Sequence, residues 1–534
     1  MKRINARGPL HFIFSLTGLL IQLVDASSET QPVAPPNFVI LLADDMGWSD
    51  AGCYGGEIRT PNIDRLAKEG LRFTQFYNNS ICGPTRASLL TGLYCQQVGH
   101  RGDRWDEPMD FSRCATFAEI LHGSGYHTMM VGKWQGRDLA VKRGFDRFFG
   151  PNCHGMISYY NEVQNNELYL NDKRWKFPQE GFYLTDAFAD YSVQFLEEAV
   201  QQDRPFLLYT AFIAPHWPLH AREKDIVPYR KLYAENGWNI LRDARFDRQR
   251  EMGLVPASWS LSPAPEDIPA WEEEREKAWQ AERMAVYAGQ ITCMDRAIGK
   301  ILEVLDRAGV VENTVVLFLS DNGATDRGSP LPTATHFAPQ LESANWRLDR
   351  VPMRPGSGPN LPPGGPETFD AYGKAWGNLS NTPLSGFKSE TYEGGIRTPL
   401  VVRWPKAIRS GGKIDGCVGH VIDLFPTLLE AAGVEYPREF QGRELTPFTG
   451  KSLVPGFEGR ASLGERELCW DAVGQAIRSG EWKLVRRAKE APWELYNLET
   501  DGTESLNLAP QFPDRVSDLE GAYRTWQTRT EATR

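Results

Sequence analysis

The stretch Phe38-Val-Ile-Leu-Leu-Ala-Asp44-Asp45 joins an unbroken apolar run to two consecutive aspartates. Four more runs rich in Val, Ile, Leu or Phe follow, each too short for a helix of normal length, at residues 128–131, 206–213, 315–319 and 400–402. Apolar runs without polar alternation are typical of parallel strands that are covered on both faces. The sequence therefore predicts a largely parallel sheet.

Helical patterns lie between some of these runs and complete the fold prediction. The clearest pattern has apolar residues three or four apart and ends at Gly309: Met284, Tyr287, Ile291, Met294, Ile298, Ile301 and Leu305. Strands that alternate with amphipathic helices predict the α/β class, here a large, mostly parallel or mixed sheet sandwiched by helices. After Pro447 short alternating segments at 476–478, 482–485 and 493–496 predict a small C-terminal antiparallel α+β subdomain.

Two stretches interrupt the alternation of strands and helices. Residues 224–282 are rich in Arg, Glu and Trp, and residues 326–366 are rich in Pro and Gly. We expect both to be long excursions over the rim of the sheet that shape access for a substrate. The predicted domains are a signal peptide at 1–26, a catalytic α/β domain at 27–455 and the C-terminal subdomain at 456–534.

The N-terminal segment is typical of an export signal. Basic residues precede an apolar stretch at residues 10–24, and Ala26-Ser27 provides a small-residue cleavage site. An uncleaved membrane anchor is the alternative, but Ser15, Thr17 and Gln22 interrupt the stretch, which is shorter than the ~20 apolar residues of a spanning helix. We therefore expect export to the periplasm or the extracellular space, without stable insertion into the membrane.

Composition excludes several classes of protein. The chain has 534 residues, of which 41% are hydrophobic and 24% charged, as in ordinary globular proteins, so disordered, collagen-like and coiled-coil classes are excluded. The net charge of −10 provides no basic surface for a phosphate backbone, so nucleic acid is not an expected partner. The eight cysteines are too sparse for a disulfide scaffold and form no C-x-x-C pair, and we expect a few disulfides among buried thiols.

Polar residues follow the predicted strands where each apolar run ends. Asp44 and Asp45 follow the first run, and Asp321-Asn322 follow the run at 315–319. Lys133 and His216 come just after two other runs. In an open α/β sheet the carboxyl ends of parallel strands share one edge, where ligands bind. Carboxylate and amide oxygens suit calcium or magnesium, although any one of these aspartates could instead be a helix cap or a turn residue.

A second group of residues surrounds a cysteine in Cys82-Gly83-Pro84-Thr85-Arg86-Ala87-Ser88-Leu89-Leu90-Thr91-Gly92. The pattern places Cys82 near a helix N-terminus and beside Arg86, an environment that stabilises an anion. From these residues alone, Cys82 could be a thiol nucleophile of low pKa or a buried structural cysteine.

The stretch from Cys82 to Gly92 resembles the sulfatase signature, in which the cysteine is converted to Cα-formylglycine by a maturation enzyme. Five further blocks are similar to sulfatase blocks in the expected order: 41–47, 132–134, 214–218, 320–323 and 392–399. The resemblance extends from residue 37 to about residue 508, and in detail it is closest to bacterial arylsulfatases.

The resemblance implies a site made of nine residues. Asp44, Asp45, Asp321 and Asn322, with the formylglycine oxygen from Cys82, would bind one Ca²⁺ ion. Arg86 would stabilise the nucleophilic oxygen, Lys133 and Lys388 would neutralise the sulfate oxygens, and His216 would protonate the leaving group. For Lys133 and Lys388 alone a solvated surface position is the alternative, and for His216 a structural turn.

One position departs from the family pattern. Sulfatases usually carry a histidine two residues after the lysine that corresponds to Lys133, whereas this chain has Gln135. An amide can form hydrogen bonds but cannot accept a proton at neutral pH. Either His154, His127 or a solvent molecule takes over, or regeneration of the aldehyde is slow.

These features together predict an exported, calcium-dependent enzyme that hydrolyses a small sulfate ester or a sulfated saccharide. One alternative is a phosphate or phosphonate ester hydrolase on the same scaffold, and another, suggested by Gln135, is a catalytically weak protein that binds sulfated glycans. Trp346, Arg347 and Trp376 in or near the second excursion are candidates for stacking on a sugar, although tryptophan is as often a packing residue.

Overall fold

The computed structural model describes residues 34–100, 109–152, 158–161, 167–178, 180–329, 352–460 and 463–533. The predicted signal peptide, His154, Trp346 and Arg347 lie outside these ranges. Pro35–Arg534 is one compact unit. In the part that is described, no helix combines the length and the apolar character needed to cross a membrane.

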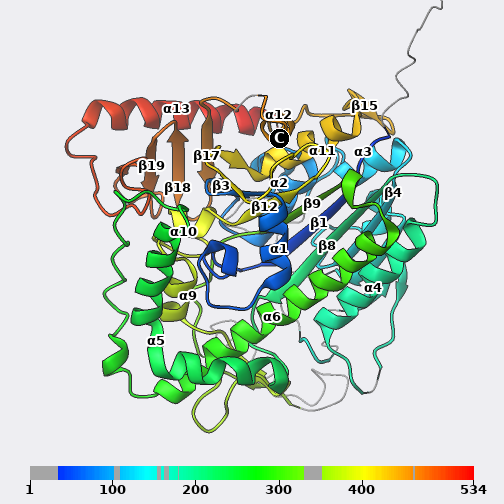
Figure 1. Ribbon diagram of the computed structural model, residues 1–534. Coiled ribbons are helices and arrows are strands. Elements are labelled where there is room, and N and C mark those ends of the chain that lie inside the picture. The colour runs from blue at the N-terminus through cyan, green and yellow to red at the C-terminus, as the bar shows by residue number, and fades with distance from the viewer. Residues whose placement is uncertain are drawn as a thin grey trace, which may run out of the picture. The chain divides into compact units, whose positions relative to one another are not determined.

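The sequence Phe38-Val-Ile-Leu-Leu-Ala forms strand β1 near the centre of a ten-stranded sheet (Figure 1). β1 pairs in parallel with β8 and β9, and β8 pairs in parallel with β4. In spatial order the strands are β13 (Lys413–Asp415), β2 (Leu71–Phe73), β12 (Leu400–Arg403), β9 (Thr314–Ser320), β1 (Asn37–Asp44), β8 (Phe206–Pro215), β4 (His127–Gly132), β5 (Arg147–Pro151), β6 (Leu168–Leu170) and β7 (Lys173–Arg174). The predicted α/β sheet is confirmed as a mixed sheet.

Strand β12 corrects one part of the prediction. The run at 400–402 does form a strand, but β12 is antiparallel to both of its neighbours, β9 and β2. A strand that is buried on both faces has the same continuous apolar sequence whichever way it runs. The sequence pattern therefore located the strand correctly and gave the wrong direction.

The two faces of the sheet carry separate cores, because successive side chains of β1 alternate between them. Val39 and Leu41 pack with α1 (Pro61–Glu69), α4 (Leu184–Ala199) and α6 (Lys277–Ala308). Phe38 and Ile40 pack with α2 (Cys82–Thr91), α3 (Phe117–Gly123) and α11 (Leu424–Ala432) on the opposite face (Figure 1). The predicted helix over Met284 and Leu305 is confirmed as α6, which ends at Gly309 in a left-handed conformation.

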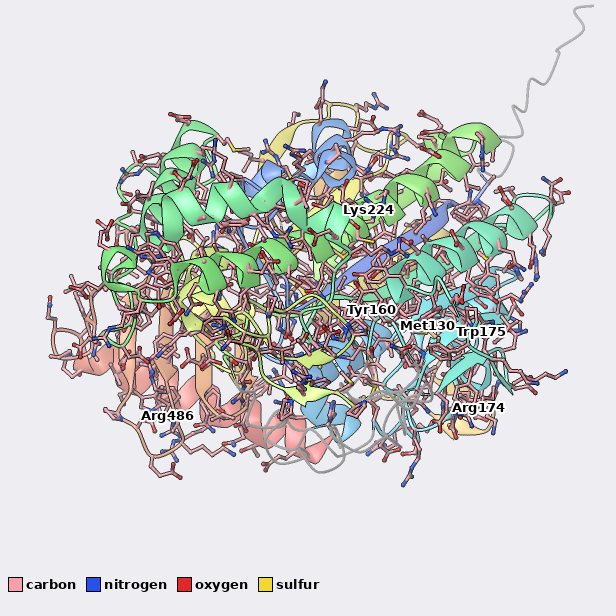
Figure 2. All side chains as sticks on the ribbon, turned by 90° about the horizontal axis from the view of Figure 1, so that it is seen from below. Met130, Tyr160, Arg174, Trp175, Lys224 and Arg486 are labelled. Atoms are coloured by element: carbon pink, nitrogen blue, oxygen red, sulfur yellow. The ribbon has the colours of Figure 1, made fainter. Side chains whose placement is uncertain are left out.

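Side chains fill the space between these layers. Met130 of β4 is fully buried, whereas Arg174 of β7, the strand at one edge of the sheet, is exposed; both are labelled in Figure 2. The short one-turn segments that connect the larger elements are η1 (Gly52–Tyr54), η2 (Cys95–Val98), η3 (Ala140–Arg143), η5 (Val311–Asn313) and η6 (Val421–Asp423).

The first predicted excursion begins and ends in helices, with irregular backbone at 252–270 between them. Residues 224–282 form most of helix α5 (Glu223–Glu251), which packs against α6, followed by η4 (Trp271–Glu273). Trp238 and Trp271 are only 3% and 5% exposed. Helix α5 bends at Gly237, where any Cβ atom would lie 2.1 Å from the Trp271 ring. These tryptophans are therefore core residues and do not line a path for substrate.

The buried face of α5 is unusually polar, which explains why its helical pattern was missed. Arg242, Arg245 and Gln249 share this face and lie three or four residues apart. The Arg245 guanidinium binds Asp50 Oδ1 at 2.9 Å and Glu57 Oε1 at 2.7 Å. Buried arginines that are paired in this way hide the apolar periodicity on which the prediction depends.

Only part of the second excursion is described. After residue 351 it forms β10 (Arg354–Pro355), which pairs in parallel with β11 (Thr368–Phe369), and α9 (Lys374–Ser380) follows. Trp376 is fully buried and contacts Trp238 with ring centroids 5.2 Å apart. The hypothesis that Trp376 stacks on a sugar is therefore wrong.

The C-terminal region forms the predicted antiparallel sheet, with α13 (Pro513–Ala532) packed against it (Figure 1). Its strands are β17 (Glu467–Asp471), β18 (Gln475–Ser479), β19 (Trp482–Arg486) and β20 (Glu494–Asn497). The remaining short elements are β3 (Phe76–Tyr77) with β14 (Gly419–His420), β15 (Glu439–Phe440) with β16 (Arg443–Glu444), α10 (Glu393–Ile396) and α12 (Val454–Phe457).

The cysteines do not form the expected bridges in the described part of the chain. Its seven cysteines are all free thiols, and six of them are buried: Cys53, Cys82, Cys95, Cys114, Cys293 and Cys469. Cys153 lies outside the described residues. Because a free buried cysteine behaves as a small apolar side chain, these thiols contribute to packing.

Candidate active site

Four acidic or amide side chains meet where β1 and β9 end. The two strands are parallel and in register, so the residues that follow them leave the same edge of the sheet. The backbone N–H of Asp321 donates to the carbonyl oxygen of Ala43 at 3.1 Å, and the Asn322 amide donates to Asp45 Oδ1 at 2.7 Å. Asp44, Asp45, Asp321 and Asn322 are at most 1% exposed.

Three oxygens of this group lack a hydrogen-bond partner among the described residues: Asp44 Oδ1, Asp45 Oδ2 and Asn322 Oδ1. Each unpaired buried acceptor costs about 1–3 kcal/mol. Ligand atoms of Asp44, Cys82 and Asp321 lie within 4.8 Å of one another. Carboxylate and amide oxygens that converge without donors fit a hard divalent cation such as Ca²⁺.

Cys82 lies beside this group at the first position of α2. The N-terminus of a helix carries a partial positive charge that favours an anion. One turn later, Arg86 donates from Nε and Nη2 to Asp321 Oδ2 at 3.1 and 2.8 Å, and from Nη2 to Asp44 Oδ2 at 3.3 Å. The helix therefore places the side chain of residue 82 between its own N-terminus and the acidic residues.

The two lysines named from the sequence also enter the site. Lys133 follows β4 and places Nζ 2.6 Å from Asp44 Oδ2, and Lys388 places Nζ 2.6 Å from Asp45 Oδ1. The side chain of Lys133 is 1% exposed and that of Lys388 is 14% exposed. Neither is a solvated surface lysine.

Positive and negative charges balance in this group, which we call the catalytic cluster. It consists of three carboxylates and three permanent cations: Asp44, Asp45, Asp321, Arg86, Lys133 and Lys388. One bound divalent cation would give the cluster a net positive charge. An anionic ester would then be attracted at short range, although the whole chain has a net charge of −10.

The carboxylates of the cluster differ in their proton affinity. Burial would raise the pKa of Asp44, but the charges of Lys133, His216 and Arg86 hold this pKa well below its usual range. For Asp321, burial and the neighbouring Asp44 carboxylate raise the pKa to about 7. A divalent cation at the three unpartnered oxygens would favour the ionised form of Asp321.

His216 lies in the loop after β8 and faces the same cluster. Its Nδ1 is 2.6 Å from the carbonyl oxygen of Trp217, so Nδ1 carries the proton and Nε2 is left facing Asp45 Oδ2 at 3.6 Å. Burial lowers the pKa of His216 to about 4, against the opposing effect of Asp45. Without a bound anion, the ring is neutral at pH 7.

Gln135 lies next to the candidate nucleophile. Its Nε2 donates to Cys82 Sγ at 3.6 Å, and its side chain is 6% exposed. His127, proposed as a substitute, is at the opposite end of β4 from Lys133 and contacts Asp146 Oδ2 at 3.1 Å. That proposal is wrong, because the strand separates His127 from the site. His154 lies outside the described residues.

The sequence did not identify His100, which lies close to the start of α2. A Cβ atom on Gly83 would be only 2.1 Å from His100 Nε2, so the glycine after Cys82 makes room for this imidazole. His100 is 3% exposed and follows η2, which packs against α2. In the sequence, only the glycine at position 83 indicated that another group lies close to this turn of α2, and a glycine does not identify which residue that is.

Comparisons with known proteins identify the family of the chain. The family model described as Sulfatase matches residues 36–434, and one described as N-sulphoglucosamine sulphohydrolase, C-terminal, matches residues 387–519. The chain is 34% identical to an uncharacterized sulfatase of Schizosaccharomyces pombe, covering 93% of this chain and 94% of the relative. It is 32% identical to the arylsulfatase of Klebsiella aerogenes, covering 78% of this chain and 91% of that one.

A solved structure supports the fold. It is titled as the structure of BT4656 in complex with its substrate D-glucosamine-2-N,6-O-disulfate. It aligns with a TM-score of 0.62 at 20% identity, covering 93% of this chain and 98% of that one.

Proposed function

The chain belongs to the sulfatase family and is a sulfuric ester hydrolase, and on this premise we propose that it cleaves sulfate monoesters with a Cα-formylglycine at position 82 and one Ca²⁺ ion. The observation that carries the proposal is the set of unpartnered buried oxygens on Asp44, Asp45 and Asn322, together with Cys82, whose Sγ lies within 4.8 Å of ligand atoms of Asp44 and Asp321. Carboxylate and amide oxygens that meet at two strand ends next to a candidate nucleophile are the ligands that a hard divalent cation prefers.

The residues that would hold the ion are the two strand-end pairs, Asp44 with Asp45 and Asp321 with Asn322, together with an oxygen on residue 82. When bound, the cation stabilises an oxygen nucleophile and the charge of the sulfate group. Arg86 fixes the Asp321 carboxylate with two hydrogen bonds, at 3.1 and 2.8 Å, and so orients this ligand before the ion arrives.

The modified side chain supplies a geminal diol, in which one oxygen attacks sulfur and the other allows the aldehyde to form again. Helix α2 presents its N-terminus to this side chain and favours the anionic oxygen. Because Cys82 is only 7% exposed in the folded chain, we propose that its maturation enzyme acts before folding is complete.

Lys133 and Lys388 are placed to bind the sulfate oxygens. Both ammonium groups already contact carboxylates of the catalytic cluster at 2.6 Å, so they are oriented before substrate arrives. Donors held in a buried site stabilise developing charge far better than donors in water.

His216 is the candidate that protonates the leaving oxygen. Its Nδ1 is committed to the Trp217 carbonyl oxygen at 2.6 Å, which leaves Nε2 for the substrate. Because a neighbouring anion favours the charged imidazole, a bound sulfate ester raises the low pKa of this ring, and the proton would then be available at Nε2.

The relatives support a proposal for the substrate class. The Klebsiella aerogenes relative is an arylsulfatase, and the structure described above holds a sulfated glucosamine. We propose a small aryl sulfate or a sulfated saccharide as substrate. The basic and apolar N-terminal segment supports export to the periplasm or the extracellular space.

Mass spectrometry and a calcium assay test the proposal. The tryptic peptide from Phe73 to Arg86 of protein co-expressed with a maturation enzyme should have the mass of the aldehyde form, and EGTA should abolish sulfate release. An unmodified thiol in an active protein, or full activity in metal-free protein, would refute the mechanism. Failure to release sulfate from any ester in a broad panel would refute the function.

A further inference from the structure

Gln135 is held in one position by the backbone and the residues on either side of it. Lys133 and Trp134 donate their backbone N–H groups to Ala211 and Pro151 at 2.8 and 3.1 Å. The Trp134 indole is 1% exposed and lies so close to Gly136 that a Cβ atom there would be 2.5 Å from the ring. The side chain of Gln135 is therefore directed at residue 82 by a rigid support.

The nitrogen and the oxygen of the Gln135 amide differ in their hydrogen bonding. Nε2 donates to Cys82 Sγ at 3.6 Å, whereas Oε1 is buried and has no partner among the described residues. A buried carbonyl oxygen without a donor is costly. The unmodified Cys82 does not offset this cost, because a thiol is only a weak hydrogen-bond donor.

The oxidation state and hydration of residue 82 decide whether Oε1 finds a partner. An aldehyde oxygen only accepts hydrogen bonds, so it can be bound by Nε2 but offers nothing to Oε1. A geminal diol has two hydroxyl groups, so one can accept from Nε2 and the other can donate to Oε1. The hydrated side chain alone satisfies both ends of the amide.

We propose that Gln135 is a positioning residue that clamps the hydrated side chain of residue 82 with both ends of its amide. The inference rests on the proposed modification of Cys82. It gives Gln135 a definite role in place of the family's histidine: the amide selects and orients the diol but takes no proton from it. No covalent step is assigned to Gln135.

The reaction of the aldehyde with an aminooxy probe tests the proposal, because the probe labels the free aldehyde and not the diol. In Gln135→Leu the labelling rate should rise about fivefold, as expected when the one hydrogen bond that only the diol makes, to Oε1, is lost; Nε2 can bond to either form. Gln475→Leu is the matched control, because Gln475 is an equally buried glutamine in β18, bonded to Arg486 and Asp471. It should label at the rate of the parent.

Labelling of Gln135→Leu at the parent's rate in a folded protein would overturn the proposal. If Gln135→Leu fails to fold, Gln135→Asn provides the test instead. Asparagine keeps the amide group, but its side chain is one methylene shorter and holds the amide farther from residue 82. Its labelling should be several times faster than that of the parent, and an unchanged rate overturns the proposal. If no protein reacts, the parent included, residue 82 is not an aldehyde, and the proposed function and this inference fall together.

Calcium titration separates this role from metal binding, because a glutamine carbonyl oxygen can also bind Ca²⁺. Calorimetry on the unmodified Cys82 protein should give the same calcium affinity for the parent and Gln135→Leu. A loss of tenfold or more in the variant would assign Oε1 to the metal and overturn the proposed clamp, while leaving the sulfatase function intact.

Discussion

Two buried charge networks in this molecule differ in how completely they are satisfied. In the second network, which we call the Lys483 cluster, Lys483 Nζ lies 2.9 Å from Glu393 Oε1 and 2.7 Å from Glu504 Oε1. Glu393 Oε2 accepts from Tyr77 Oη at 2.7 Å, and Glu504 Oε2 accepts from Ser385 Oγ at 2.6 Å. Each carboxylate oxygen of the Lys483 cluster has a hydrogen-bond or ion-pair partner, and Glu504 Oε1 has only the ion pair with Lys483. At the catalytic site, Asp44 Oδ1, Asp45 Oδ2 and Asn322 Oδ1 have no hydrogen-bond partner among the described residues.

This difference indicates that the Lys483 cluster joins parts of the fold, whereas the catalytic cluster is arranged to bind a ligand. The Lys483 cluster connects β19 of the C-terminal sheet to α10 and the loop before α13. Removing one partner from a completed buried network leaves an uncompensated charge. A network with converging unpaired oxygens gains most from a ligand. Substitutions in the Lys483 cluster should therefore affect unfolding, and substitutions in the catalytic cluster should affect turnover.

The largest effect is expected at Cys82. Cys82→Ala removes the precursor of the nucleophile, and sulfate release should fall by about 10⁴- to 10⁶-fold, as when other enzymes lose a nucleophile. The control is Cys469→Ala, which removes a buried thiol from β17. It should keep nearly full activity, with at most a modest loss of thermal stability. Substantial turnover by Cys82→Ala would contradict the assignment of the site.

A matched pair of lysine substitutions tests the comparison directly. Lys133→Met should lower kcat/KM by about 10²- to 10³-fold, because it removes a preorganised donor to the sulfate. Lys483→Met should lower the free energy of unfolding by about 3–5 kcal/mol, because it leaves the buried Glu504 carboxylate without its cation and Glu393 with only the ion pair to Arg397 at 3.4 Å. Turnover and chemical denaturation measured on both variants decide the point. Equal losses of stability would mean that the two clusters do not differ in role.

Much of the candidate site could be predicted because its signals are local. An apolar run that ends in Asp44-Asp45, and another that ends in Asp321-Asn322, mark strand ends without any knowledge of the partner strands. The parallel register of β1 and β9 then brings the two pairs together, as the rule for open α/β sheets predicts. Lys388 was different, because only the resemblance to sulfatases singled it out.

The features that were missed depend on contacts between residues far apart in sequence. The direction of β12 is set by its neighbours and leaves no trace in its apolar run. Helix α5 buries Arg242 and Arg245, so its inner face looks polar until the partner carboxylates are known. The contact between Gly83 and His100 joins the first turn of α2 to the segment after η2, and no spacing rule relates the two.

Removal of calcium should destabilise the protein through the catalytic cluster alone. At a free calcium concentration about 100 times Kd, binding adds about 2.7 kcal/mol to the free energy of unfolding. Chelation should therefore lower Tm in the parent and in Glu504→Gln alike. Asn322→Ala, which removes one of the unpartnered oxygens, should show a smaller response at the same calcium concentration. A full response in Asn322→Ala would place the ion elsewhere.

The smallest effect concerns pH and the Lys483 cluster. Burial raises the pKa of Glu504 from 4.5 to about 7, against the opposing charge of Lys483. Between these two values the folded state binds more protons than the unfolded state, so this group's contribution to stability falls as pH rises from about 4.5 to 7. Glu504→Gln lacks this dependence. Its difference in unfolding free energy from the parent should therefore move by about 2 kcal/mol in favour of the variant between pH 5 and pH 8. Denaturation curves at the two pH values measure this shift. If the difference in unfolding free energy between the variant and the parent is the same at both pH values, Glu504 is already ionised at pH 5. The neighbouring cations would then balance the charges of both carboxylates of the Lys483 cluster.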